Sequence, residues 1–208
     1  LNSLYGAILN PGCRFFDIRI GQSVTLTGRC ITKHMASKVN EIVAGSYDHK
    51  GESVVYGDTD SVYFTAHKTL QKEINEGVIP WTKDSVVALY DKISDEVNGS
   101  FKAFMVKAFH CPSTRGEVIA AGRELVASKG LFITKKRYAV LYYDKEGKRA
   151  DTEGKEGKVK AMGLDLKRSD TPVYVQDFLS EILYMVLTGK TEKEVLDRIS
   201  EFRAEFKA

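Results

Sequence analysis

The sequence predicts an α+β fold, in which an antiparallel sheet packed by helices is followed by an all-helical C-terminal segment. Residues 52–66 alternate between apolar and polar types, and residues 131–143 are rich in β-branched and aromatic types, which is typical of antiparallel strands. Residues 22–44 and 83–109 carry apolar side chains every three or four places, which predicts two long helices. Residues 169–208 carry only helical signals.

The first long helix, over residues 22–44, leads into a hairpin. Gly57–Asp60 supplies turn-forming residues in the middle of the strand-like stretch 52–66, so the turn is expected there. The apolar stripe of the helix consists of Val24, Ile31, Met35, Val39 and Ile42.

The second long helix is expected over residues 83–109, with Thr82 as its N-terminal cap. Asn98–Gly99 weakens the helical pattern midway, which leaves a kinked helix as an alternative to a straight one.

Strands are expected after this helix. Residues 117–127 are predicted to form a short strand and residues 131–143 a longer one. Residues 144–148 contain Asp and Gly, which predicts a turn followed by a return strand.

The C-terminal segment is predicted to be a pair of helices. The first begins at Ser169–Pro172, where proline suits the first turn, and it ends at Gly189. Thr191 and Glu194 have the spacing of a capping box for the second helix. This αα-hairpin is interpreted as the start of a further domain.

Size and composition are those of a globular protein. The chain has 208 residues, of which 43% are hydrophobic and 28% charged. No apolar run reaches the roughly 18 residues that a membrane span needs, and no signal segment opens the chain. Three cysteines that form no close pair indicate a reducing compartment without disulfides or structural zinc. We therefore expect a cytoplasmic protein with no membrane partner.

Positive charge is concentrated in one block. Residues 129–168 hold twelve Lys and Arg against six Asp and Glu, a local charge of +6, whereas residues 169–208 carry −3. Such a block suits a polyanionic partner, although a solvated surface has the same composition.

The stretch YGDTDSVYF at residues 56–64 contains the main candidate site. Asp58 and Asp60 are like charges placed close together beside a hydrophobic run, and a divalent cation with oxygen ligands would remove their repulsion. Phosphoryl or nucleotidyl transfer uses such sites. Two alternatives remain open from the motif alone, because Asp-Thr-Asp is also ordinary turn chemistry and also occurs in metal-dependent glycosyltransferases.

Three motifs in order resemble those of family B replicative DNA polymerases, in particular the T-even type of tailed phages. They are NSLYG at residues 2–6, GDTDS at 57–61 and KKRY at 135–138. RFFDIR at 14–19, VTLTGR at 24–29 and RSDTP at 168–172 also look like that family, so that the resemblance runs from residue 1 to about residue 175.

The resemblance implies a catalytic role for three carboxylates. Asp60 matches the family's direct metal ligand, Asp58 has a lesser electrostatic part, and Glu124 lies near the metals. The expected cofactor is Mg²⁺, with two ions in the complete enzyme.

The resemblance also implies contacts with the substrates. Asn2, Tyr5 and Gly6 match the end of the fingers helix, where the tyrosine lies near the nascent base pair; a helix C-cap is the structural alternative. Lys135, Lys136, Arg137 and Tyr138 match the motif that contacts primer–template DNA.

The KKRY stretch also has a purely structural explanation, and its position on a predicted strand determines which side chains share a face. On a single strand, Lys135 and Arg137 would share one face and Lys136 and Tyr138 the other. Without the resemblance, an edge strand protected by lysines would explain the same residues.

The resemblance is incomplete. The family's first carboxylate motif, an Asp followed by a Ser-Leu-Tyr-Pro run, does not occur in this sequence. Its absence, together with a start at LNSLYG without Met, predicts a part of a larger polymerase that is inactive alone. We expect residues 1–20 to be the end of the fingers, 21–166 the palm and 167–208 the beginning of the thumb.

The parent enzyme is expected to add deoxynucleoside triphosphates to a primer 3′ end on primer–template DNA in phage replication. A sliding clamp, bound through a further C-terminal segment, is an additional partner hypothesis. The remaining alternatives are a metal-dependent glycosyltransferase and a non-catalytic nucleic-acid-binding module, in which Asp58 and Asp60 would serve only the turn.

Overall fold

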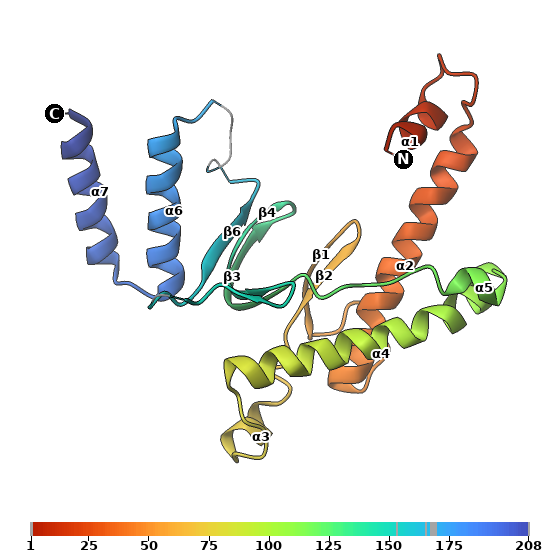
Figure 1. Cartoon of the computed structure of the whole chain (residues 1–208), viewed down its shortest axis with the longest axis horizontal. Coiled ribbons are helices and arrows are strands. Elements are labelled where there is room, and N and C mark those ends of the chain that lie inside the picture. Colours follow the sequence, from red (N-terminus) through yellow and green to blue (C-terminus); the bar gives the residue numbers. More distant parts are fainter. Residues whose placement is uncertain (1, 153, 165, 167–169, 208) are drawn as a thin grey trace. The chain divides into compact units, whose positions relative to one another are not determined.

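The computed structural model describes residues 2–152, 154–164, 166 and 170–207, and it confirms the α+β class (Figure 1). The chain forms two compact units. The first unit comprises the chain up to Pro80 together with Ile93–Ala121, and the second comprises Trp81–Lys92 and the chain from Gly122 onward. Helix α4 (Lys83–Phe109) contributes residues to both units.

The first unit is built on the long helix α2 (Ile18–Ala44), which begins earlier than the expected start at residue 22. The carboxylate of Asp17 accepts a hydrogen bond from the backbone N–H of Arg19 at 2.9 Å, so this residue caps the helix. Gly45 ends the helix with a φ of 74°. The other elements of this unit are α1 (Asn2–Leu9), β1 (Val54–Asp58), β2 (Ser61–Phe64), α3 (Gln71–Asn75), the second part of α4 and α5 (Ser113–Gly116).

Helix α4 has the predicted bounds, and its predicted cap is confirmed. The hydroxyl of Thr82 accepts a hydrogen bond from the backbone N–H of Ser85 at 3.2 Å. The helix continues through Asn98–Gly99. The Asn98 side chain bonds to both backbone groups of Ala121, at 2.7 and 2.9 Å, so it ties α4 to the segment that leads toward the next strand.

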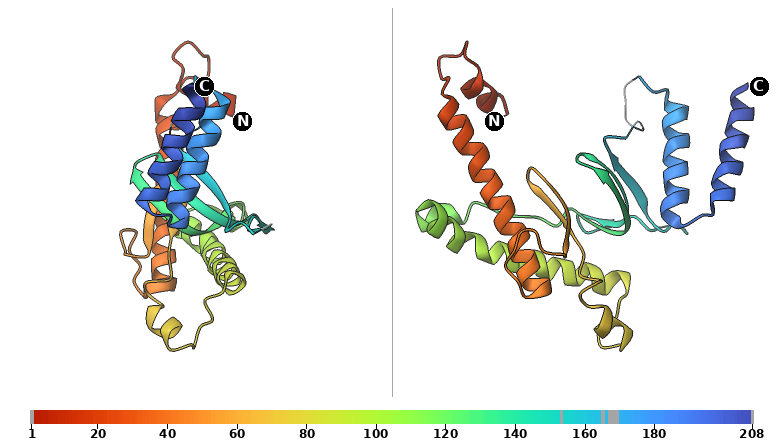
Figure 2. Two further views of the ribbon diagram at one scale, coloured as in Figure 1. Left: turned by 90° about the vertical axis from the view of Figure 1, so that its left-hand side faces the viewer. Right: turned by 180° about the vertical axis from the view of Figure 1, so that it is seen from behind.

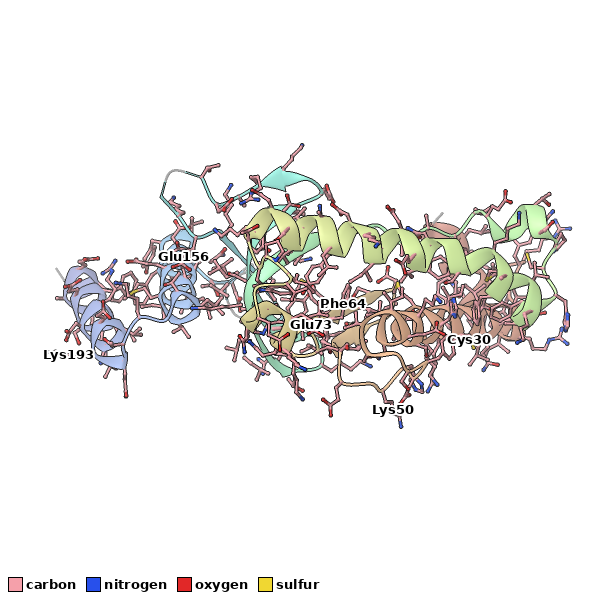
Figure 3. All side chains as sticks on the ribbon, turned by 90° about the horizontal axis from the view of Figure 1, so that it is seen from below. Cys30, Lys50, Phe64, Glu73, Glu156 and Lys193 are labelled. Atoms are coloured by element: carbon pink, nitrogen blue, oxygen red, sulfur yellow. The ribbon has the colours of Figure 1, made fainter. Side chains whose placement is uncertain are left out.

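The core of the first unit lies between α2 and the second part of α4, whose side chains fill the space between the two helices (Figure 3). Both helices contribute small or apolar buried residues. His34 is also buried there, and its ring stacks on Phe104 with 3.9 Å between centroids. Its two ring nitrogens lie 2.7 Å from the hydroxyl of Tyr47 and 2.9 Å from that of Ser100. The apolar residues of this core are Ala36, Val39, Ile93, Val97, Phe101 and Met105.

The second unit contains a four-stranded antiparallel sheet. Strand β4 is central, because β3, β5 and β6 all pair with it. Among the described residues, six helices and strands of this unit follow α5 in the chain. They are β3 (Leu125–Thr134), β4 (Arg137–Lys145), β5 (Lys148–Arg149), β6 (Lys158–Met162), α6 (Val173–Thr188) and α7 (Glu192–Lys207).

Two strand predictions are wrong, while the turn after them is confirmed. The strand expected over 117–127 begins only at Leu125, because residues 117–124 form a turn and irregular backbone. The single strand expected over 131–143 is two strands, since β3 ends at Thr134 and β4 begins at Arg137. The predicted return strand is β5.

The C-terminal helices form the predicted αα-hairpin, and Figure 2 shows α6 and α7 side by side. Gly189 ends α6 with a φ of 83°. Glu194 accepts a hydrogen bond from the backbone N–H of Thr191 at 2.8 Å, and the hydroxyl oxygen of Thr191 accepts one from the backbone N–H of Glu194 at 3.3 Å, as a capping box requires. Leu187 of α6 packs in one cluster with Ala139 and Leu141 of β4.

In the part of the chain that the structure describes, no helix combines the length and the apolar character that crossing a bilayer requires.

Candidate functional site

The first candidate site is the tip of the β1–β2 hairpin, which lies alongside α2 in Figure 1. Asp58 pairs with Ser61, so the loop between the strands consists of Thr59 and Asp60 alone. Thr59 has a φ of 45°, a left-handed conformation that β-branched residues rarely adopt. The tight turn therefore places two carboxylates at the end of a two-stranded ribbon.

The two carboxylates differ in their surroundings. Asp58 is half-buried, and one of its oxygens accepts a hydrogen bond from the hydroxyl of Thr59 at 3.1 Å. Asp60 is exposed. Among the residues that the structure describes, no lysine, arginine or histidine forms an ion pair with either of them. An Asp60 buried against a lysine would have contradicted the metal hypothesis, and it is not found.

The turn fits part of a magnesium site. Carboxylate oxygens are the ligands that Mg²⁺ prefers, and those of Asp60 are open to solvent. Within residues 2–152, 154–164, 166 and 170–207, however, no three His, Cys, Asp or Glu side chains are grouped closely enough to hold a metal ion. The donor set of this turn would need further ligands.

The residues predicted to contact the base pair lie on α1, in the same unit as the acidic turn. Tyr5 is partly exposed, at 36%. A side-chain carbon at Gly6 would meet nothing within 4 Å. Both residues lie inside the helix, so the alternative of a helix C-cap does not describe them. Asn2 belongs to the same helix, and its side chain lies outside the described part of the structure.

The predicted catalytic carboxylate Glu124 lies in the second unit, immediately before β3. Its side chain accepts a hydrogen bond from Nζ of Lys160 on β6 at 2.6 Å. Its backbone carbonyl accepts another from the N–H of Glu146 at 2.8 Å. The carboxylate is half exposed, so the lysine partner leaves part of it accessible.

Arg123, next to Glu124, is held by two carboxylates. It pairs with Asp91 of α4 and with the buried Asp144 of β4, the latter at 2.5 Å. Burial alone would lower the pKa of Arg123, but the hydrogen bonds with Asp91 and Asp144 outweigh it and keep the pKa above its ordinary value. The backbone before Glu124 is therefore anchored by a partly buried ion-pair cluster.

The KKRY motif is a hairpin turn and not one strand, which corrects the predicted geometry. Lys135 and Lys136 form the connection between β3 and β4, and Lys136 has a φ of 62°. The expected sharing of faces between Lys135 and Arg137 is therefore wrong. Both lysines are exposed, and Arg137 donates from Nε to the backbone carbonyl of Gly163 at 3.1 Å.

Tyr138 differs from the other three residues of its motif. Only 7% of it is exposed, and its ring stacks on Phe132 of the paired strand with 5.6 Å between centroids. Tyr138 therefore contributes to the packing of the hairpin.

Sequence reasoning missed two residues that support the candidate sites. Thr32 of α2 donates from its hydroxyl to the backbone carbonyl of Thr59 at 2.8 Å. Gly163 leaves room for the turn, because a side-chain carbon there would lie 2.0 Å from the carbonyl oxygen of Lys136. Neither contact could have been found from local patterns, since both join segments distant in sequence.

Comparison with known families bears on these sites directly. Residues 1–107, which include NSLYG, α2 and the acidic turn, match the model of DNA polymerase family B. The chain belongs to this family.

Individual DNA polymerases match over a longer range. The DNA-directed DNA polymerase of Escherichia phage RB69 is 32% identical over 196 residues, which is 90% of this chain and 21% of the relative. That of Enterobacteria phage T4 is 28% identical over 226 residues, 100% of this chain and 23% of the relative. DNA polymerase II of Escherichia coli is 24% identical over 204 residues, 93% of this chain and 22% of the relative. The chain thus spans about a fifth of the length of these relatives.

The family match confirms the predicted resemblance to family B, and the similarity to the two phage polymerases agrees with the predicted T-even type. The glycosyltransferase alternative is thereby set aside.

Proposed function

We propose that this chain contributes the end of the fingers (1–20), most of the palm (21–166) and the beginning of the thumb (167–208) to a family B polymerase. The complete enzyme would add deoxynucleoside triphosphates to a primer 3′ end. The observation that supports this most is the exposed Asp60 at a tight turn, without an ion-pair partner among the described residues, inside the segment that matches the family.

The acidic turn would hold Mg²⁺, which supplies neutralisation of phosphate charge and activation of the attacking oxygen. Asp60 would be the direct ligand, because its carboxylate is open and uncommitted. Asp58 would act through its charge, since Thr59 already donates to it. We also propose a catalytic role for the carboxylate of Glu124, which would require part of its interaction with Lys160 to be exchanged.

The substrates would be bound by the two other motifs. Tyr5 would place its flat ring near the nascent base pair, with Asn2 beside it on α1 and with Gly6 leaving space for the pair. At the second hairpin, exposed cations would contact the DNA backbone. These are Lys135, Lys136 and Arg137, with Tyr138 acting through the hairpin that it packs.

By itself the chain should not polymerise. Two-metal transfer needs carboxylates from two motifs, and the first of them does not occur in this sequence. Primer extension by the isolated 208 residues, assayed with and without Mg²⁺, tests this. Magnesium-dependent incorporation would contradict it.

The decisive experiment is Asp60→Asn in the complete polymerase. Replacement of a ligand carboxylate by an amide should lower primer extension by about 100-fold or more. Asp95→Asn is the matched control, because Asp95 is an exposed carboxylate on α4 outside the candidate site, and it should leave extension unchanged. Wild-type extension by Asp60→Asn would favour a binding module in which the aspartates serve only the turn.

A further inference from the structure

The turn that carries Asp60 adopts a conformation that its own sequence disfavours. Thr59 is β-branched and has a φ of 45°, whereas Gly or Asn is usual at such a position. Backbone of this kind persists only where surrounding structure holds it. The structure shows what supplies that support.

The side chain of Thr32 connects helix α2 to the turn. The hydroxyl of Thr32 lies 2.8 Å from the carbonyl oxygen of Thr59 and 3.1 Å from that of Gly28, one helical turn earlier. A hydroxyl has a single proton to donate, and the shorter contact leads to the hairpin. The hydrogen bond therefore joins α2 to the strained residue itself.

This bond acts directly on the orientation of Asp60. The carbonyl of Thr59 and the N–H of Asp60 belong to the same peptide group, which is planar and rigid. Fixing the carbonyl oxygen therefore limits rotation of this peptide plane. The plane ends at the Cα atom of Asp60, so its orientation influences the direction of the Asp60 side chain.

The other end of the hairpin is held by the same helix. Asn40 of α2 is fully buried, donates to the carbonyl of Asp48 at 2.7 Å and accepts from the N–H of Ser53 at 3.0 Å. Gly51 packs against it, since a side-chain carbon there would lie 2.6 Å from the Asn40 amide. The base and the tip of the hairpin thus have separate anchors on α2.

From this geometry we infer that Thr32 is a positioning residue for the catalytic centre, which holds the Thr59–Asp60 peptide in the orientation that Mg²⁺ binding needs. This inference rests on the proposed role of Asp60 as a metal ligand. Asn40 fixes where the hairpin begins, and Thr32 fixes the direction of its tip.

The test compares three variants of the complete polymerase. Thr32→Val keeps the shape of the side chain and removes the donor, whereas Thr32→Ser keeps the donor. Thr25→Val is the matched control, because among the described residues the Thr25 hydroxyl donates to carbonyls of its own helix, those of Gly21 and Gln22. For each variant we would measure kcat, the Mg²⁺ concentration at half-maximal rate and the affinity for primer–template DNA without Mg²⁺.

Thr32→Val should raise the Mg²⁺ requirement and lower kcat, each by about threefold to tenfold, as expected for the loss of one hydrogen bond. Affinity for DNA should not change. Thr32→Ser should restore both values to within about twofold, and Thr25→Val should match the wild type. A purely structural role would lower thermal stability without a change in the Mg²⁺ dependence of the remaining activity, and that outcome would overturn the inference.

Asp60→Asn separates this inference from the proposed function. If Asp60→Asn abolishes extension while Thr32→Val behaves as wild type, Thr32 is not a positioning residue and the metal site stands. If Asp60→Asn extends primers normally, both ideas fail. Should Thr32→Val not fold, Thr32→Ser decides, because loss of its activity despite a retained hydroxyl also contradicts the inference.

Discussion

The hairpins β1–β2 and β3–β4 both contain a strained tight turn, but different contacts support them. Each has proposed functional residues at a tight turn, and each turn contains a non-glycine residue with positive φ, Thr59 at 45° and Lys136 at 62°. The first hairpin is a two-stranded ribbon with half-buried and exposed residues, whereas the second belongs to a four-stranded sheet with a buried central strand.

The supports of the two hairpins differ accordingly. The first is held by neutral hydrogen bonds from Thr32 and Asn40 of one helix. The second is backed by Gly163, and its central strand ends in a buried ion pair between Arg123 and Asp144. A two-stranded hairpin outside a larger sheet depends on side-chain hydrogen bonds for support. A strand inside a sheet is held by side-chain packing and by backbone pairing with its neighbours.

The largest effect should follow from removing the charge that supports the second hairpin. Arg123→Met leaves Asp144, whose side chain is 3% exposed, without its cation, and it should lower the free energy of unfolding by about 3–5 kcal/mol. Urea denaturation measures this. The double variant Arg123→Met with Asp144→Leu should regain most of the loss, because no unpaired charge then remains buried. Equal instability of the single and double variants would contradict the buried ion pair as the main support.

An intermediate effect is expected at the glycine behind the KKRY turn. Gly163→Ala should destabilise the protein by more than about 2 kcal/mol, because the added carbon combines a positive φ of 64° with an overlap at the Lys136 carbonyl. Gly147→Ala is the control, since Gly147 has a φ of 78° in another turn of the same sheet and open space around it. It should lose only about 1 kcal/mol. Equal losses of stability of the two variants in thermal unfolding would show that the positive φ alone, and not the overlap with the Lys136 carbonyl, determines the cost.

The smallest effect concerns pH and distinguishes the two units, because all four histidines of the sequence belong to the first. Burial, followed by the charge of Lys38, lowers the pKa of His34, and Glu41 opposes this. The folded state therefore favours the neutral ring, and stability that is present above the ordinary value of 6.5 is lost as the pH falls below it.

Hydrogen exchange, corrected for the pH dependence of intrinsic exchange, should show the first unit opening more readily at about pH 5 than at about pH 7, while the second changes less. His34→Gln should reduce this difference, and His67→Gln, at an exposed position, should not. An equal response of both units in the wild type would contradict the assignment to His34.

Local patterns in the sequence predicted α4, the Thr191–Glu194 capping box, the helix end at Gly189 and the acidic hairpin. These depend on spacing and on the chemistry of neighbouring residues, which a single chain displays directly. The predictions failed over 117–127, where the strand begins only at Leu125, and over 131–143, where β-forming residues continue across the turn at Lys135–Lys136. No glycine, proline or asparagine marks that turn, so propensity alone could not find it.

The sequence by itself therefore determined which carboxylates and cations are available and that Asp58 and Asp60 lie at the turn of a hairpin. Only the tertiary structure decided how those elements end and what fixes their tips, because Thr32 and Gly163 act on residues far from them in the chain. Periodicity and capping arise between near neighbours and are visible in one dimension, whereas a left-handed residue in a turn is stabilised by contacts that exist only after the chain has folded.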